Sequence, residues 1–83
     1  MQKNKEKNTL ILGLGYVGLT LGTIMAESGH IVYGIDIDKS IIDKINTGEA
    51  HFYEKGINKK INTFLNKTLF ASTSLLDFNH VDF

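Results

Sequence analysis

Apolar and polar positions along the chain follow a repeating order of short buried strands and amphipathic helices. The apolar run Thr9–Leu12 stops abruptly at a glycine, which is typical of a strand buried on both faces of a parallel sheet. The run Ile31–Ile35 is rich in β-branched residues and predicts a second buried strand, which ends at Asp36. A shorter run, Leu69–Ala71, predicts a third strand.

Three helices are predicted in the segments between these strands, because apolar residues recur there every three or four positions. The first helix is expected from Tyr16 to about Ser28, with Gly29 as a helix-ending residue. The second has Asp38 as its N-cap and ends at Gly48. The apolar positions of the three helices are, in order, Val17, Leu21, Ile24 and Met25; Ile41, Ile42 and Ile45; and Ile57, Ile61, Phe64 and Leu65.

The order of these elements predicts the α/β fold class. It indicates the first half of a Rossmann-type parallel sheet, with three strands and their helices and the start of a fourth strand at His80–Phe83. Residues 1–8 are expected to be a disordered tail, and residues 9–83 the N-terminal part of an NAD(P)-binding Rossmann domain. In the usual order the first strand lies between the second and the fourth. The first strand would therefore be an open edge, which indicates a fragment of a longer domain.

Composition excludes several classes of function. Nine basic and nine acidic residues cancel, so no nucleic-acid partner is predicted. No apolar stretch approaches the roughly 20 residues that span a bilayer, and no export signal precedes the first strand, so we expect a cytoplasmic chain with no membrane partner. The absence of cysteine excludes a disulfide framework and a cysteine nucleophile within these residues.

The segment with the clearest chemistry is the glycine turn Gly13-Leu14-Gly15-Tyr16-Val17-Gly18, which follows a predicted strand and opens a predicted helix. In such a turn Gly13 permits a tight bend, Gly15 lets a diphosphate approach the backbone, and Gly18 allows the helix to pack closely on the strand. The positive end of the helix dipole then faces the diphosphate without a basic side chain. All six residues of the turn are candidate cofactor contacts.

Asp36 completes the predicted cofactor site, because it stands at the end of the next strand, 18 positions after Gly18. Its carboxylate would accept hydrogen bonds from the adenosine ribose and would repel the extra phosphate of NADP, which favours NAD. The alternative is a strand-end carboxylate with a purely structural role.

The remaining polar candidates carry weaker signals. His30, His51 and His80 are scattered without metal-ligand spacing, so surface or turn positions are expected for them and no metal site is predicted. Glu54 has two interpretations of equal weight, a buried polar contact or an acid near the start of the third helix. Gly22 follows Gly18 by one helical turn and indicates close packing of the helix on the sheet.

These segments together resemble the N-terminus of the nucleotide-sugar 6-dehydrogenases, the UDP-glucose/GDP-mannose dehydrogenase family. The tyrosine and valine inside the glycine turn are the most specific part of the resemblance, which covers the chain from about residue 9 to its end. The matching segments are Ile11–Leu19, Gly29–Asp38, Ile45–Gly48, His51–Ile57 and Leu69–Ser74. Two positions depart from the family pattern. Ile41 stands where many members have a basic residue, unless Lys39 or Lys44 replaces that contact, and Lys55 stands where many have proline.

The resemblance implies a function for a longer parent enzyme. Family members oxidise the C6 alcohol of a UDP- or GDP-sugar to a uronic acid with two NAD molecules, so NAD and a nucleotide-sugar are the implied partners, and a homo-oligomer is expected. The family's catalytic cysteine, lysine and asparagine come later in the chain, so no catalytic residue is expected here. Two alternatives stay open: the Rossmann half of another NAD-dependent dehydrogenase, of hydroxy-acid or prephenate type, or a non-catalytic truncated product that self-associates.

Overall fold

The structure, a computed structural model, describes residues 7–82 and contains the predicted alternation of strands and helices. The three predicted strands and three predicted helices all form, and most boundaries agree within one or two residues. In chain order the elements are β1 (Asn8–Leu12), α1 (Tyr16–Glu27), β2 (Ile31–Ile35), α2 (Lys39–Asn46), α3 (Ile57–Phe64), β3 (Leu69–Ser72) and a short 3₁₀ helix, η1 (Leu75–Phe78).

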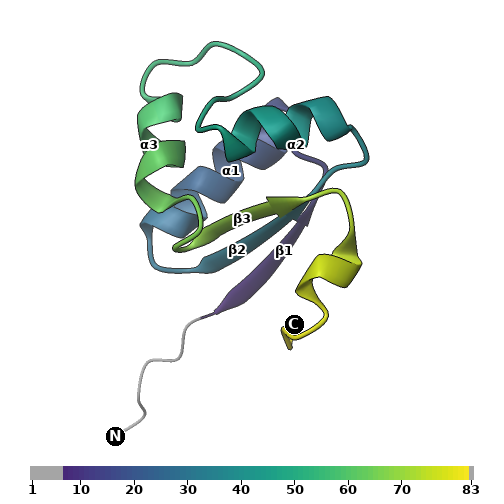
Figure 1. The fold of residues 1–83 in the computed structure, drawn as a ribbon. Coiled ribbons are helices and arrows are strands. Elements are labelled where there is room, and N and C mark those ends of the chain that lie inside the picture. Colours follow the sequence, from purple (N-terminus) through teal and green to yellow (C-terminus); the bar gives the residue numbers. More distant parts are fainter. Residues whose placement is uncertain (1–6, 83) are drawn as a thin grey trace, which may run out of the picture.

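The three strands form one parallel sheet in the order β1-β2-β3. Leu10 pairs with Tyr33, and Tyr33 in turn pairs with Phe70. The carboxyl ends of all three strands therefore lie at the same end of the sheet. Figure 1 shows α1, α2 and α3 on one side of the sheet and η1 on the other. This is the first half of a Rossmann-type fold, as the sequence predicts.

Helix α1 is buried through Leu19 and three small residues. Its buried positions are Leu19, Gly22, Thr23 and Ala26. The predicted apolar stripe is therefore wrong in part, because Val17, Leu21 and Ile24 are 75%, 48% and 49% exposed. The reason is the close approach of helix and sheet at Gly22: a Cβ there would lie 3.4 Å from Ile11 Cδ1 and 3.5 Å from Val32 Cγ1, so a long side chain has no room at this position. The predicted packing role of Gly22 is confirmed.

The two edges of the sheet differ. At the β3 edge, the Asn46 side-chain amide donates to the Ala71 carbonyl at 3.3 Å, and the Asn66 N–H donates to the Leu69 carbonyl at 2.8 Å. At the other edge, β1 pairs with β2 on one side and with no strand of residues 7–82 on its outer side. Leu12 of β1 is 73% exposed. The expected open edge at the first strand is therefore present in the described part of the chain.

The segments at the two ends of the chain differ from the sequence predictions. The predicted tail includes Asn8, which instead begins β1, while residues 1–6 lie outside the described part of the chain. Residues 80–82, the described part of the expected fourth strand, do not form a strand. Instead η1 turns the chain across the sheet, because Phe78 packs against Tyr33 with ring centroids 4.9 Å apart. The Asn8 side-chain amide then donates to the Asp82 carbonyl at 3.1 Å.

No helix formed by residues 7–82 is long and apolar enough to cross a membrane.

Candidate NAD-binding site

The glycine turn connects the end of β1 to the start of α1 and is fixed by close backbone contacts. Gly13 has φ +95°, a conformation that side chains rarely adopt, and its N–H donates to the Ile35 carbonyl at 2.7 Å. A Cβ on Gly18 would lie 2.0 Å from the Gly13 carbonyl oxygen. Both ends of the turn therefore require glycine for steric reasons within the protein itself.

Gly15, in the middle of the turn, is different, because its backbone does not require glycine. It is the N-cap of α1 with φ −68°, and no heavy atom of another residue lies within 4 Å of the position that a Cβ would take. Within residues 7–82 no side chain caps this helix, and its first turn contains no acidic residue. The Tyr16 and Val17 side chains are 56% and 75% exposed. An open backbone surface with uncapped N–H groups fits a diphosphate.

Asp36 lies directly beside this turn, at the carboxyl end of β2. Its Oδ2 accepts the Leu14 N–H at 2.8 Å, and its Oδ1 accepts the Asp38 N–H at 2.9 Å. The carboxylate is half-buried, and each oxygen has lone-pair capacity for a further hydrogen bond. Asp36 thus has the structural role of the alternative interpretation, and it keeps the capacity to accept hydrogen bonds from a ribose.

Leu14 takes part in the turn through its backbone, because its side chain is only 1% exposed. This side chain packs on β2 at Gly34, where a Cβ would lie 2.7 Å from Leu14 Cδ2. Gly34 therefore makes room for the leucine in the turn. The signal that could have identified this role is the position of Gly34 inside a predicted strand, since an isolated glycine there indicates the close approach of another segment.

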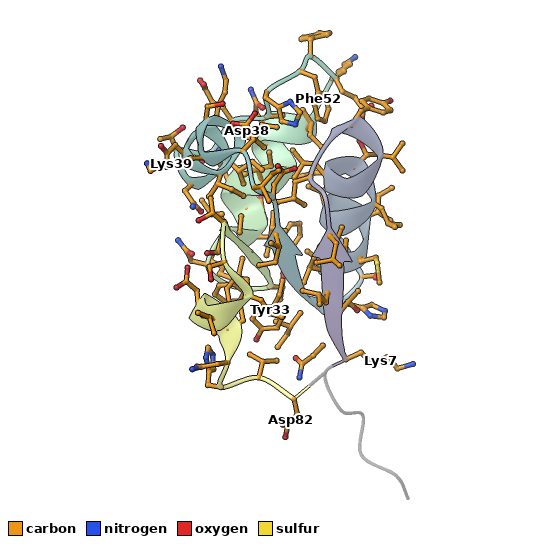
Figure 2. The ribbon with its side chains drawn as sticks, turned by 90° about the vertical axis from the view of Figure 1, so that its right-hand side faces the viewer. Lys7, Tyr33, Asp38, Lys39, Phe52 and Asp82 are labelled. Carbon is orange, nitrogen blue, oxygen red and sulfur yellow. The ribbon has the colours of Figure 1, made fainter. Side chains whose placement is uncertain are left out.

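The loop between α2 and α3, residues 47–56, packs against the glycine turn. His51 Nε2 lies 2.7 Å from the Leu14 carbonyl oxygen, and the Tyr16 hydroxyl donates to the Glu54 carboxylate. The Phe52 ring lies between these two contacts, with its centroid 5.0 Å from both the Tyr16 and the His51 rings. Figure 2 shows Phe52 and Asp38 at the same end of the molecule, far from Lys7 and Asp82.

Sequence reasoning missed the contribution of this loop, because neither His51 nor Glu54 has a spacing that relates it to the turn. His51 does lie in a turn, but it reaches a backbone carbonyl 37 positions earlier in the chain. Of the two interpretations of Glu54, the polar contact forms, but it is exposed rather than buried, and the first turn of α3 contains no acidic residue among residues 7–82. The Glu54 carboxylate contacts Tyr16, and it is the Glu54 backbone carbonyl that accepts the Ile57 N–H at the start of α3.

Two titratable groups near the site have shifted pKa values. The hydrogen bond to the Glu54 carboxylate, together with its negative charge, raises the pKa of Tyr16 above its ordinary value. Hydrogen bonds from the Ser40 hydroxyl and N–H lower the pKa of Asp38, which caps α2 as predicted.

Both lysines proposed as substitutes for the missing basic residue lie on α2 and are exposed. Lys39 Nζ lies 2.7 Å from Asp43 Oδ2 on the exposed face of α2. Lys44 is exposed in the last turn of that helix. A contact of either lysine with the adenosine stays a prediction.

The parallel sheet, the glycine turn at the carboxyl end of β1 and the acid at the end of β2 define a dinucleotide-binding α/β domain. The family model described as "UDP-glucose/GDP-mannose dehydrogenase family, NAD binding domain" matches residues 7–82. The chain therefore belongs to this family, and the resemblance found in the sequence is confirmed. The family is one of oxidoreductases, and the cofactor that this domain binds is NAD.

Named relatives and solved structures agree with the family assignment. The chain is 38% identical over 63 residues to UDP-glucose 6-dehydrogenase AglM of Haloferax volcanii, which covers 76% of the chain and 15% of that protein. It is 33% identical over 72 residues to UDP-N-acetyl-D-mannosamine dehydrogenase of Campylobacter jejuni, which covers 87% of the chain and 18% of that protein. The structure is similar to that of a UDP-glucose dehydrogenase from Pyrobaculum islandicum, with TM-score 0.78, 29% identity and coverage of 88% of this chain and 17% of that one. The chain thus spans less than a fifth of the length of these relatives.

Proposed function

We propose that residues Gly13–Gly18 and Asp36 hold NAD, and that the chain is the N-terminal cofactor-binding part of a nucleotide-sugar 6-dehydrogenase. The observation that carries the proposal is the exposed backbone at Gly15, next to the uncapped start of α1 and the Asp36 carboxylate. The uncapped N–H groups at the start of α1, from Gly15 onward, would donate to the diphosphate, and Asp36 would accept from the ribose.

In the complete enzyme this site would present the nicotinamide to a nucleotide-sugar, whose C6 alcohol is oxidised to the acid with two NAD. The support for this activity is the family assignment together with the names of the relatives, which are dehydrogenases of UDP-sugars. The catalytic groups and the sugar site would come from residues beyond those of this chain, which has no cysteine. The relatives differ in their sugar, which is UDP-glucose in one name and UDP-N-acetyl-D-mannosamine in another.

The substitution Gly15→Val tests the cofactor site separately from the fold. Because Gly15 has an ordinary φ and open space at its Cβ position, valine is accommodated by the protein, but its side chain occupies the space that the diphosphate needs. Backbone amide shifts of the ¹⁵N-labelled chain, followed during titration with NAD, should locate binding at residues 13–18 in the original protein and show none in Gly15→Val.

Lys67→Val provides the matched control. Lys67 is exposed just before β3, at the opposite end of the sheet from the glycine turn, so its replacement should leave NAD binding unchanged. Urea denaturation of both variants checks that they remain folded. Equal NAD affinity in the original protein and in Gly15→Val would contradict the proposed position of the diphosphate.

A further inference from the structure

Leu14 is held by three independent contacts within the glycine turn. Its N–H donates to Asp36 Oδ2 at 2.8 Å, its carbonyl oxygen lies 2.7 Å from His51 Nε2, and its side chain is 1% exposed. Since a carbonyl oxygen can only accept, His51 Nε2 is the donor in the second contact. The residue between the first two glycines of the turn is therefore fixed on both sides of its backbone.

The contact with His51 has a consequence for the neighbouring peptide group. The Leu14 carbonyl and the Gly15 N–H belong to one planar peptide unit, and because this unit is trans, the two groups point in opposite directions. The Gly15 carbonyl accepts the Leu19 N–H at 2.9 Å, which holds the peptide unit after Gly15, and no side chain packs at the Gly15 Cβ position to hold the unit before it. Within this peptide unit, the Leu14 carbonyl carries the hydrogen bond from His51, and the Gly15 N–H points the opposite way.

We propose that His51 is a positioning residue of the diphosphate site: by holding the Leu14 carbonyl, it orients the Gly15 N–H toward the cofactor. This inference rests on the proposed function, since it assigns that N–H to the diphosphate. The loop that carries His51 is itself secured on both sides. The Asn62 side-chain amide donates to the Gly48 carbonyl at 2.8 Å, the Ala50 N–H donates to Asn58 Oδ1 at 2.9 Å, and Glu54 accepts the Tyr16 hydroxyl.

The test compares three replacements of His51 that differ in reach. His51→Gln keeps an N–H donor at a reach close to that of Nε2, His51→Asn keeps the same amide on a shorter side chain, and His51→Ala removes the donor. His80→Ala is the control, because His80 is an exposed histidine in the turn after η1. Each labelled variant of the complete chain is recorded first without ligand and then in a titration with NAD.

We expect the Gly15 and Tyr16 amide signals of His51→Ala and His51→Asn to shift or broaden in the absence of ligand, because the peptide plane loses its single orientation. The Gly13 amide, which donates to the Ile35 carbonyl, should be little affected. NAD should bind about three- to tenfold more weakly to these two variants, the effect of one lost hydrogen bond. His51→Gln and His80→Ala should retain both the signals and the affinity.

Several results would overturn the inference. One is a Gly15 amide signal that is the same in His51→Ala as in the original protein. If urea denaturation then shows a loss of stability, the role of His51 is structural only. The inference is also contradicted if His51→Gln and His51→Asn have the same amide signals and the same NAD affinity. Loss of the folded spectrum in all three variants would contradict it as well. Absence of NAD binding in the original protein would contradict the proposed function instead, while the amide signals without ligand still decide whether His51 orients Gly15.

Discussion

Two glycines one turn apart in α1 give opposite predictions for the same substitution. A Cβ on Gly18 would lie 2.0 Å from the Gly13 carbonyl oxygen, whereas real Cβ atoms stay beyond 3.0 Å, so the start of the helix would have to move about 1 Å from the turn. The obstacle is backbone, which cannot rotate away as a side chain can. A Cβ on Gly22 meets only side-chain atoms, the nearest at 3.4 Å, which is ordinary contact.

The magnitudes follow from helix propensity and steric overlap. In a helix interior, alanine is favoured over glycine by about 1 kcal/mol, so Gly22→Ala should be neutral or stabilising by up to that amount. For Gly18→Ala the overlap should outweigh this gain and destabilise by about 3 kcal/mol or more. For a domain of this size, that difference lowers the melting temperature by at least about 12 °C.

Thermal and urea unfolding, followed by circular dichroism, measure both variants. The turn geometry changes only in Gly18→Ala, so that variant should also lose NAD binding, whereas Gly22→Ala should keep it. Equal melting temperatures for the two variants would refute the steric argument, because propensity alone predicts that both substitutions stabilise the protein.

Three further predictions concern the acidic groups of the site. Replacing Asp36 by asparagine should weaken NAD binding and reduce the preference for NAD over NADP, measured by calorimetric titration, because the charge that repels the extra phosphate is removed; an unchanged preference would count against the ribose assignment. The folded-state pKa of Asp38 is lowered by Ser40, so its cap contributes stability above its ordinary pKa and loses it as pH falls through the lowered value; urea denaturation from neutral to acid pH should show a smaller decline in Asp38→Ala, and an equal decline would refute the linkage. The pKa of Tyr16 is raised by Glu54, so its neutral form stabilises the fold below its ordinary pKa and this contribution is lost as pH rises through the raised value; ultraviolet absorbance should show Tyr16 ionising at lower pH in Glu54→Gln, and no change would exclude Glu54 as the cause.

The sequence by itself determined the elements and the positions of the glycine turn and its acid. Strands β1 and β2 and the turn between β1 and α1 follow from local patterns, because an apolar run, a glycine that must take positive φ and an N-capping aspartate act within a few residues of one another. For the same reason the cap of α2 by Asp38 and the end of β2 at Asp36 lie where they were expected.

Only the tertiary structure decided which face of α1 is buried and which distant residues reach the turn. Periodicity marks Val17, Leu21 and Ile24 as a core stripe, but the close contact at Gly22 turns the small-residue face toward the sheet. His51 and Glu54 reach the turn because the loop between α2 and α3, residues 47–56, packs against it. Such contacts join residues far apart in the chain, so no local pattern of apolar and polar residues encodes them, and they follow only from how the helices pack on the sheet.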